Sequence, residues 1–161
     1  MPFRRRYRVP RDQSLVLRAE EQQALREQAQ AAFPAECCGL LLSCFDGRVQ
    51  AMPMINRSPT PDRFEIAVSD LLGAHRRARQ EGGAVIGHYH SHPNGLARPS
   101  AADVAAIADP AAVWVIVAVD PQTGTPGAIT AWHPVERQGK AGFRPVLLLS
   151  ARRILRDDPE K

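Results

Sequence analysis

The segment His90-Ser91-His92-Pro93, followed after six residues by Ser100-Ala101-Ala102-Asp103, constrains this chain more than any other feature. Two imidazoles and one carboxylate are sufficient protein ligands for a catalytic zinc ion, which leaves its fourth position to water. Side chains at i and i+2 of an extended segment point to the same side. His90 and His92 can therefore hold one ion if a strand runs into a loop here. Asp103 must then arrive from the next element.

These residues resemble the signature of a known family. His-Ser-His-Pro, six residues and Ser-x-x-Asp match the JAMM (MPN+) metalloprotease motif. The upstream run Pro34-Ala35-Glu36-Cys37-Cys38-Gly39-Leu40-Leu41 resembles the segment that carries the catalytic glutamate of that family. The likeness extends roughly from Leu17 to Leu149 and is nearest to small stand-alone bacterial members. At His88 the chain departs from the family, which usually has a bulky aromatic or aliphatic residue there.

The resemblance implies a set of roles. One Zn²⁺ per chain would be held by His90, His92 and Asp103. Glu36 would accept a proton from the water that zinc activates, and Ser100 would help to stabilise the oxyanion. The implied reaction is hydrolysis of a peptide or isopeptide amide at the carboxyl-terminal Gly-Gly end of a ubiquitin-like or sulfur-carrier protein.

Each of these residues also has a simpler interpretation. Ser100-x-x-Asp103 is close to a helix capping box, in which the serine caps the backbone and the acidic side chain reaches back. His90 and His92, taken alone, fit polar residues at the end of a strand. A lone glutamate at a strand entrance, such as Glu36, is usually only solvated. The metal interpretation depends on finding all of them together at the family spacing.

His88 offers a different ligand set. It shares a strand face with His90 and His92, so a three-histidine site would leave Asp103 as a helix cap alone. The family pattern favours Asp103 as ligand, with His88 packed or hydrogen-bonded beneath the site. The other histidines, His75 and His133, have no partners at recognisable spacing and are predicted to lie on the surface.

Hydrophobic periodicity and turn residues predict the secondary structure. Asp46-Gly47 between two apolar runs indicates a hairpin, and Ser69 is expected to cap a helix that Gly82-Gly83 stops. The predicted helices are 19–33, 69–80 and one from Ser100 that ends at Pro110, and the predicted strands are 15–17, 39–44, 48–55, 84–90, 113–120, 128–135 and 143–149. This order predicts a single α+β domain with a mixed β-sheet and flanking helices. The resemblance implies the JAMM/MPN architecture, which is similar to that of cytidine deaminases.

Composition sets the domain organisation and compartment. A chain of 161 residues, 44% hydrophobic, fits one domain at 14–150, between a flexible basic leader at 1–13 and a charged tail at 151–161. The three cysteines are an odd number without zinc-ribbon spacing, which indicates reduced thiols. The absence of a signal-type apolar segment, and of any run near the about 18 apolar residues of a membrane span, predicts a cytoplasmic protein that does not enter membranes.

Charge and motifs narrow the partners. The net charge of +4 is concentrated in the arginines of the leader and in Arg76, Arg77 and Arg79. Nucleic-acid binding would call for aromatic residues among the arginines or for a known binding motif, and Tyr7 is the only aromatic residue in the arginine run of the leader. Nucleic-acid binding is therefore not expected, and a solvated basic tail or a surface suited to an acidic protein partner is favoured. A deaminase is disfavoured because the chain has neither His-x-Glu nor Pro-Cys-x-x-Cys. An inactive MPN-type scaffold that binds a ubiquitin-like partner without catalysis remains as an alternative.

Overall fold

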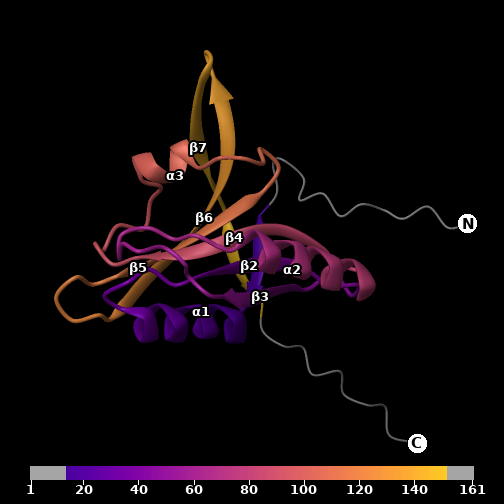
Figure 1. Cartoon of the computed structure of the whole chain (residues 1–161), viewed down its shortest axis with the longest axis horizontal. Coiled ribbons are helices and arrows are strands. Elements are labelled where there is room, and N and C mark those ends of the chain that lie inside the picture. The colour runs from indigo at the N-terminus through magenta and orange to yellow at the C-terminus, as the bar shows by residue number, and fades with distance from the viewer. Residues whose placement is uncertain (1–13, 152–161) are drawn as a thin grey trace, which may run out of the picture.

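The computed structural model describes residues 14–151, which form a mixed β-sheet with helices on both faces (Figure 1). The elements in chain order are β1 (Leu15–Arg18), α1 (Ala19–Ala32), β2 (Cys38–Ser43), β3 (Val49–Met54), α2 (Val68–Gln80), β4 (Ala84–His92), α3 (Ala101–Ala105), β5 (Val113–Val119), β6 (Pro126–Arg137), β7 (Lys140–Val146) and β8 (Leu148–Ala151). The single α+β domain expected from the sequence is confirmed.

The main sheet has six strands in the order β3-β2-β4-β5-β6-β7. β4 and β5 run parallel, whereas the other neighbouring pairs are antiparallel. β1 and β8 pair in parallel as a separate two-stranded sheet. β4, which carries the histidines, is therefore an interior strand, hydrogen-bonded on both sides. The distal part of the β6–β7 hairpin projects away from the body of the domain (Figure 1).

Alternation along β2 separates two apolar layers. Leu41 clusters with residues of α1, whereas Leu40 and Leu42 cluster with residues of α2. The helix residues in these clusters are Leu25 and Ala29 of α1 and Ala74 and Ala78 of α2. Directly opposite residues of paired strands point to the same side, and His88 is the partner of Leu40. The histidines of β4 therefore lie on the α2 side of the sheet.

Several local predictions are confirmed. The Asp46-Gly47 turn joins the antiparallel strands β2 and β3, with Gly47 at a positive φ of 81°. α2 stops before Gly82, whose φ is 77°. The cysteines Cys37, Cys38 and Cys44 are free thiols.

Among the helices of residues 14–151, none combines the length and the apolar character of a membrane span.

Other boundaries differ from the prediction. α2 begins at Val68 after Ala67 and has no side-chain cap, so the predicted cap at Ser69 is wrong. β4 continues to His92 because the pairing with β5 extends that far. α3 ends at Ala105, well before Pro110. The last backbone hydrogen bonds of the helix are donated by the Ala106 amide to the carbonyl oxygens of Ala102 and Asp103.

The last predicted strand, 143–149, is two strands. β7 ends at Val146, and β8 leaves the main sheet to pair with β1. His133 is only 4% exposed, so its predicted surface position is wrong; it lies on β6 with Nδ1 3.2 Å from the Pro134 carbonyl oxygen. His75 is half-buried on α2. The predicted leader (1–13) and tail, apart from Ala151, fall outside the described residues.

Replacing Gly87 with alanine is expected to destabilise the protein by about 1–3 kcal/mol or more. A Cβ atom at this β4 position would lie 1.8 Å from the carbonyl oxygen of Val113, its partner on β5. The backbone of β5 could move away only by distorting its pairing with β4. Gly142→Ala on β7 is the matched control, because nothing lies within 4 Å of the added atom. Urea unfolding should show the loss only for Gly87→Ala. Equal stability of the two variants would contradict the close β4–β5 approach.

Candidate metal centre

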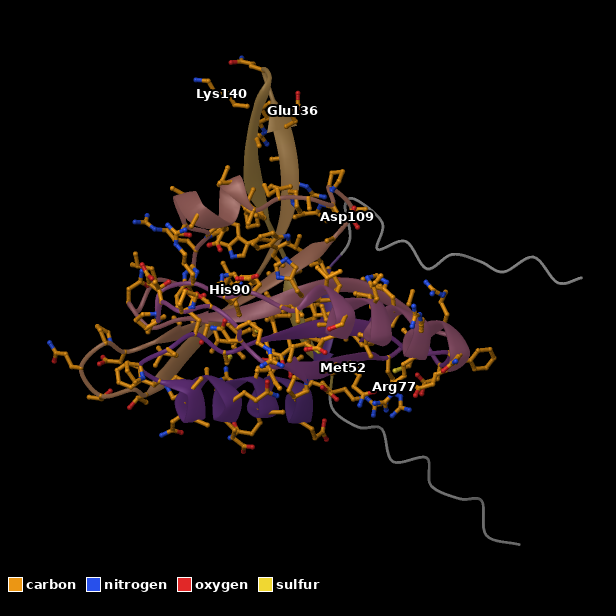
Figure 2. The ribbon with its side chains drawn as sticks, in the orientation of Figure 1. Met52, Arg77, His90, Asp109, Glu136 and Lys140 are labelled. Atoms are coloured by element: carbon orange, nitrogen blue, oxygen red, sulfur yellow. The ribbon has the colours of Figure 1, made fainter. Side chains whose placement is uncertain are left out.

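The pairing of β2 with β4 builds the first half of the site. His90 is the register partner of Cys38, and β4 ends at His92. His90 is 0% exposed and His92 3% exposed. As residues i and i+2 of one strand, they present their rings to the same side. Figure 2 shows His90 near the centre of the molecule, far from the hairpin tip marked by Glu136 and Lys140.

The three predicted ligands converge. The Nε2 atoms of His90 and His92 are 2.9 Å apart. Asp103 Oδ1 lies 3.1 Å from Nε2 of His90, and Oδ2 lies 3.2 Å from Nε2 of His92. Tetrahedral zinc with ligand bonds of about 2.0–2.1 Å separates its ligand atoms by roughly 3.3 Å. The donor set and its spacing therefore fit a zinc ion, and His90, His92 and Asp103 form a candidate metal site.

The ring of His92 is held in the tautomer that a metal requires. Its Nδ1 lies 2.9 Å from the carbonyl oxygen of Leu96. A carbonyl only accepts hydrogen bonds, so Nδ1 must carry the proton, and Nε2 is left with its lone pair directed at the site. Ligating histidines usually donate their second ring nitrogen in this way.

Asp103 serves as a helix cap and faces the histidines at the same time. The Ser100 amide donates to Asp103 Oδ2 at 2.6 Å, and the Asp103 amide donates to Ser100 Oγ at 3.1 Å, which completes a capping box. The capping interpretation and the ligand interpretation are therefore compatible, because Oδ1 is not used by the cap. Burial would raise the pKa of Asp103, but the adjacent imidazoles of His90 and His92 and the Ser100 amide hold it well below its usual range.

Glu36 reaches the site through an extension of the β2–β4 pairing. The Cys37 amide donates to Ser91 Oγ at 2.8 Å, and the Ser91 amide donates to the Cys37 carbonyl at 3.1 Å. Continuing this antiparallel register by one residue puts Glu36 opposite His92. The side chain of Glu36 is buried, and burial raises its pKa to about 7, although His92 acts in the opposite direction. A carboxyl group with this pKa can both accept and return a proton near neutral pH.

A cavity of about 390 Å³ opens on these groups. Glu36, Ser100 and Asp103 line it together with the segment before α2, small residues in and just after α3, and the aromatic rings of β4 and β5. The lining from these other segments includes Asp62, Phe64, Ile66, Ala102, Ala106, His88 and Trp114. The predicted residues Glu36, Ser100 and Asp103 thus share one cavity, beside the two histidines.

His88 is separate from the three convergent donors. Its ring packs against Trp114 at a centroid distance of 3.9 Å and lies 6.3 Å from the ring of His90. Burial lowers the pKa of His88 to about 3, so the ring is neutral. The packed position expected for His88 from the sequence is confirmed. His88 is not one of the three residues whose donor atoms converge, which are His90, His92 and Asp103.

Sequence reasoning missed Phe64 and Trp114. Phe64 stacks on His90 at 4.7 Å, and Trp114 approaches the same ring edge-on at 5.9 Å. Trp114 lies in a uniformly apolar strand and Phe64 in a polar loop, so neither periodicity nor motif spacing distinguishes them. Their contacts with His90 and their place in the lining of the cavity identify them.

The chain is similar to known proteins in sequence and in fold. The family profile described as prokaryotic homologs of the JAB domain matches residues 18–134. A protein from Desulfitobacterium hafniense, solved in solution, is 26% identical with a TM-score of 0.67 over 86% of this chain and 94% of its own. A protein from Salinibacter ruber is 29% identical with a TM-score of 0.55 over 83% and 90% of the two chains.

A third similar structure is a JAB1/MPN domain protein from Archaeoglobus fulgidus. It is 22% identical with a TM-score of 0.50 over 86% of this chain and 98% of its own, a likeness that concerns the fold alone. No curated protein sequence matches the chain.

Proposed function

Because this chain belongs to the family of prokaryotic homologs of the JAB domain, we propose that it is a zinc-dependent peptidase that hydrolyses an amide bond at the carboxyl end of a ubiquitin-like or sulfur-carrier protein. The observation that carries the proposal is the convergence of His90, His92 and Asp103 beside a cavity that Glu36 also lines. An inactive scaffold has no need for a complete donor set with a buried carboxyl group next to it.

His90, His92 and Asp103 would hold the ion. A bound zinc supplies Lewis-acid polarisation of a carbonyl and lowers the pKa of a water molecule towards about 7. Glu36 takes a proton from the attacking water and returns it to the leaving amine, which its buried, readily protonated carboxyl group supports. His92 is held in orientation by Leu96, and Asp103 by the cap of α3.

Ser100 donates a hydrogen bond to the developing oxyanion. Its Oγ already accepts from the Asp103 amide, but that bond uses a lone pair and leaves the hydroxyl proton available. Ser100 also lines the cavity with Glu36 and Asp103. One side chain can thus cap the helix and face the reacting carbonyl.

Ser100→Ala is expected to lower turnover by about 10²-fold or more, as for loss of an oxyanion donor, and to cost only about 1 kcal/mol in stability from the lost cap. Zinc content should change little, because the hydroxyl is not a ligand. Steady-state kinetics, urea unfolding and metal analysis of the same preparation separate these effects. Loss of zinc in proportion to activity would assign Ser100 a purely structural role.

The substrate proposal is a compact carrier with a Gly-Gly tail. The cavity is small, and Ala102 of α3 and Ala106 just after it contribute to its lining, which favours an extended tail without bulky side chains. Extended tails in such clefts are commonly recognised through their main chain. We propose that the reaction takes place in the cytoplasm, without a nucleic-acid or membrane partner.

A carrier ending in Gly-Gly and extended by a short peptide should be cut after the second glycine, and a zinc chelator should abolish the cleavage. A carrier with Val-Val at the same positions is the matched control and should be cut at least about 10-fold more slowly, the low end of discrimination by a few methylene groups. Mass spectrometry of the products identifies the cut. Equal rates on both tails, or cuts scattered through denatured proteins, would contradict carrier processing.

A further inference from the structure

His90 differs from His92 in how its ring is oriented. Nδ1 of His92 is hydrogen-bonded to the Leu96 carbonyl, whereas Nδ1 of His90 is buried and has no hydrogen-bond partner among the described protein groups. A ligating histidine is usually held through this second nitrogen, because the bond fixes both tautomer and ring direction. Some other contact must therefore hold the ring of His90.

Aromatic rings enclose His90 instead. Phe64 lies nearly parallel to it, with 4.7 Å between centroids and 26° between planes. Trp114 meets it edge-on at 5.9 Å and 83°. Both arrangements lie within the range of about 4.5–7 Å at which aromatic pairs attract. We propose that Phe64 and Trp114, with His88 packed against both rings, form an aromatic box that positions His90 for zinc in place of the missing hydrogen bond.

The box is itself fixed. Asn56 Nδ2 donates to the Arg63 carbonyl at 3.0 Å, and Asn56 Oδ1 accepts from the Glu65 amide at 3.1 Å. These bonds tie the backbone on both sides of Phe64. The same Asn56 amide group donates to the Glu36 carbonyl at 3.0 Å, which links the loop to the strand entrance. Trp114 in turn packs against Phe143, with 4.9 Å between the ring centroids.

The box also accounts for the departure from the family at His88. Its ring is 3.9 Å from Trp114 and 5.5 Å from Phe64. Its Nδ1, like that of His90, has no protein hydrogen-bond partner among the described residues. His88 therefore fills its place as a flat, packed ring, where the resemblance predicts a bulky aromatic or aliphatic side chain.

Phe64 is a positioning residue in this proposal, which rests on the proposed zinc site but not on the identity of the substrate. Zinc affinity, measured by competition with a chromophoric chelator, should fall about 10- to 100-fold in Phe64→Leu, the usual loss when the support of a ligand is removed. The ligand-field bands of the Co²⁺ form should change with it. Phe64→Tyr, which keeps the ring, should restore both.

Ile66→Ala is the matched control, because Ile66 lines the same cavity from the same loop without contacting His90 through an aromatic ring. It should bind zinc as the wild type does. His88→Phe should also keep zinc, since the box needs only a ring at that position. Urea unfolding verifies that each variant is folded.

The outcomes are distinct. Unchanged zinc affinity and Co²⁺ spectrum in Phe64→Leu, equal losses in Ile66→Ala, or loss of zinc in His88→Phe would each overturn the aromatic box. A wild-type protein that fails to bind zinc at all would overturn the proposed function as well. Zinc binding by the wild type with no effect of Phe64→Leu overturns the box alone.

Discussion

Glu36→Gln is expected to lower turnover by about 10²- to 10⁴-fold, the usual contribution of general acid-base catalysis, while leaving fold and zinc content intact. The carboxyl group is buried in the cavity that Asp103 and Ser100 also line. Glutamine has nearly the same shape but cannot take up a proton, so the substitution removes the proposed chemistry and little else. Turnover of a tail-extended carrier, with zinc analysis of the same sample, measures both.

The direction of the Glu36 pKa supports this assignment. Burial raises the pKa to about 7, so the group is neither permanently ionised nor permanently protonated near neutral pH. A bound cation favours the ionised form and shifts the group towards the base that the reaction needs. Activity should therefore fall on the acid side, as Glu36 takes up a proton.

Glu65→Gln is the matched control for this experiment. Glu65 lines the same cavity, but it is exposed and lies in the loop before α2. Its substitution should change turnover by no more than a few-fold. Full activity in Glu36→Gln would remove Glu36 from the mechanism, and equal losses in both variants would point to a general electrostatic effect.

Removing both histidines should abolish metal binding. Wild-type protein is expected to contain about one zinc per chain, and the double variant His90→Ala, His92→Ala close to none, because a single carboxylate cannot retain the ion. Asp103→Ala should also lose zinc, since Asp103 Oδ1 and Oδ2 lie within 3.2 Å of the histidine nitrogens. Elemental analysis after dialysis against a weak chelator measures the content.

Thermal unfolding gives an independent measure of the same site. A ligand that binds only the folded state stabilises it by an amount that grows with concentration over Kd. Added zinc should raise the melting temperature of the wild type and of a His75→Ala control, whose histidine lies on α2 outside the cluster. It should leave the double variant unchanged. Stoichiometric zinc in the double variant would contradict the assignment.

The secondary structure was predictable where local chemistry is decisive. Gly47 and Gly82 adopt positive φ, which favours glycine, so the turn after β2 and the end of α2 could be read from the sequence. The start of α2 could not, because Val68 begins the helix without a side-chain cap. The division of the last strand depends on β8 pairing with β1, more than 130 positions away in sequence. No local sequence pattern predicts that pairing.

The candidate ligands were predictable because their positions follow from short segments. His90 and His92 share a face through the two-residue period of a strand, and the Ser100–Asp103 spacing defines the first turn of a helix. The site role of Glu36 was available only through family resemblance. Its burial and raised pKa depend on neighbours from other elements.

The sequence by itself determined the ligand types, their order along the chain and the α+β class, since these depend on residue identity and on short-range periodicity. Tertiary structure decided that Asp103 both caps α3 and faces the histidines, that His133 is buried, and that Phe64 stacks on His90. These facts depend on contacts between segments far apart in the chain. Such segments meet only in the assembled sheet, so their contacts cannot be inferred from spacing along the sequence.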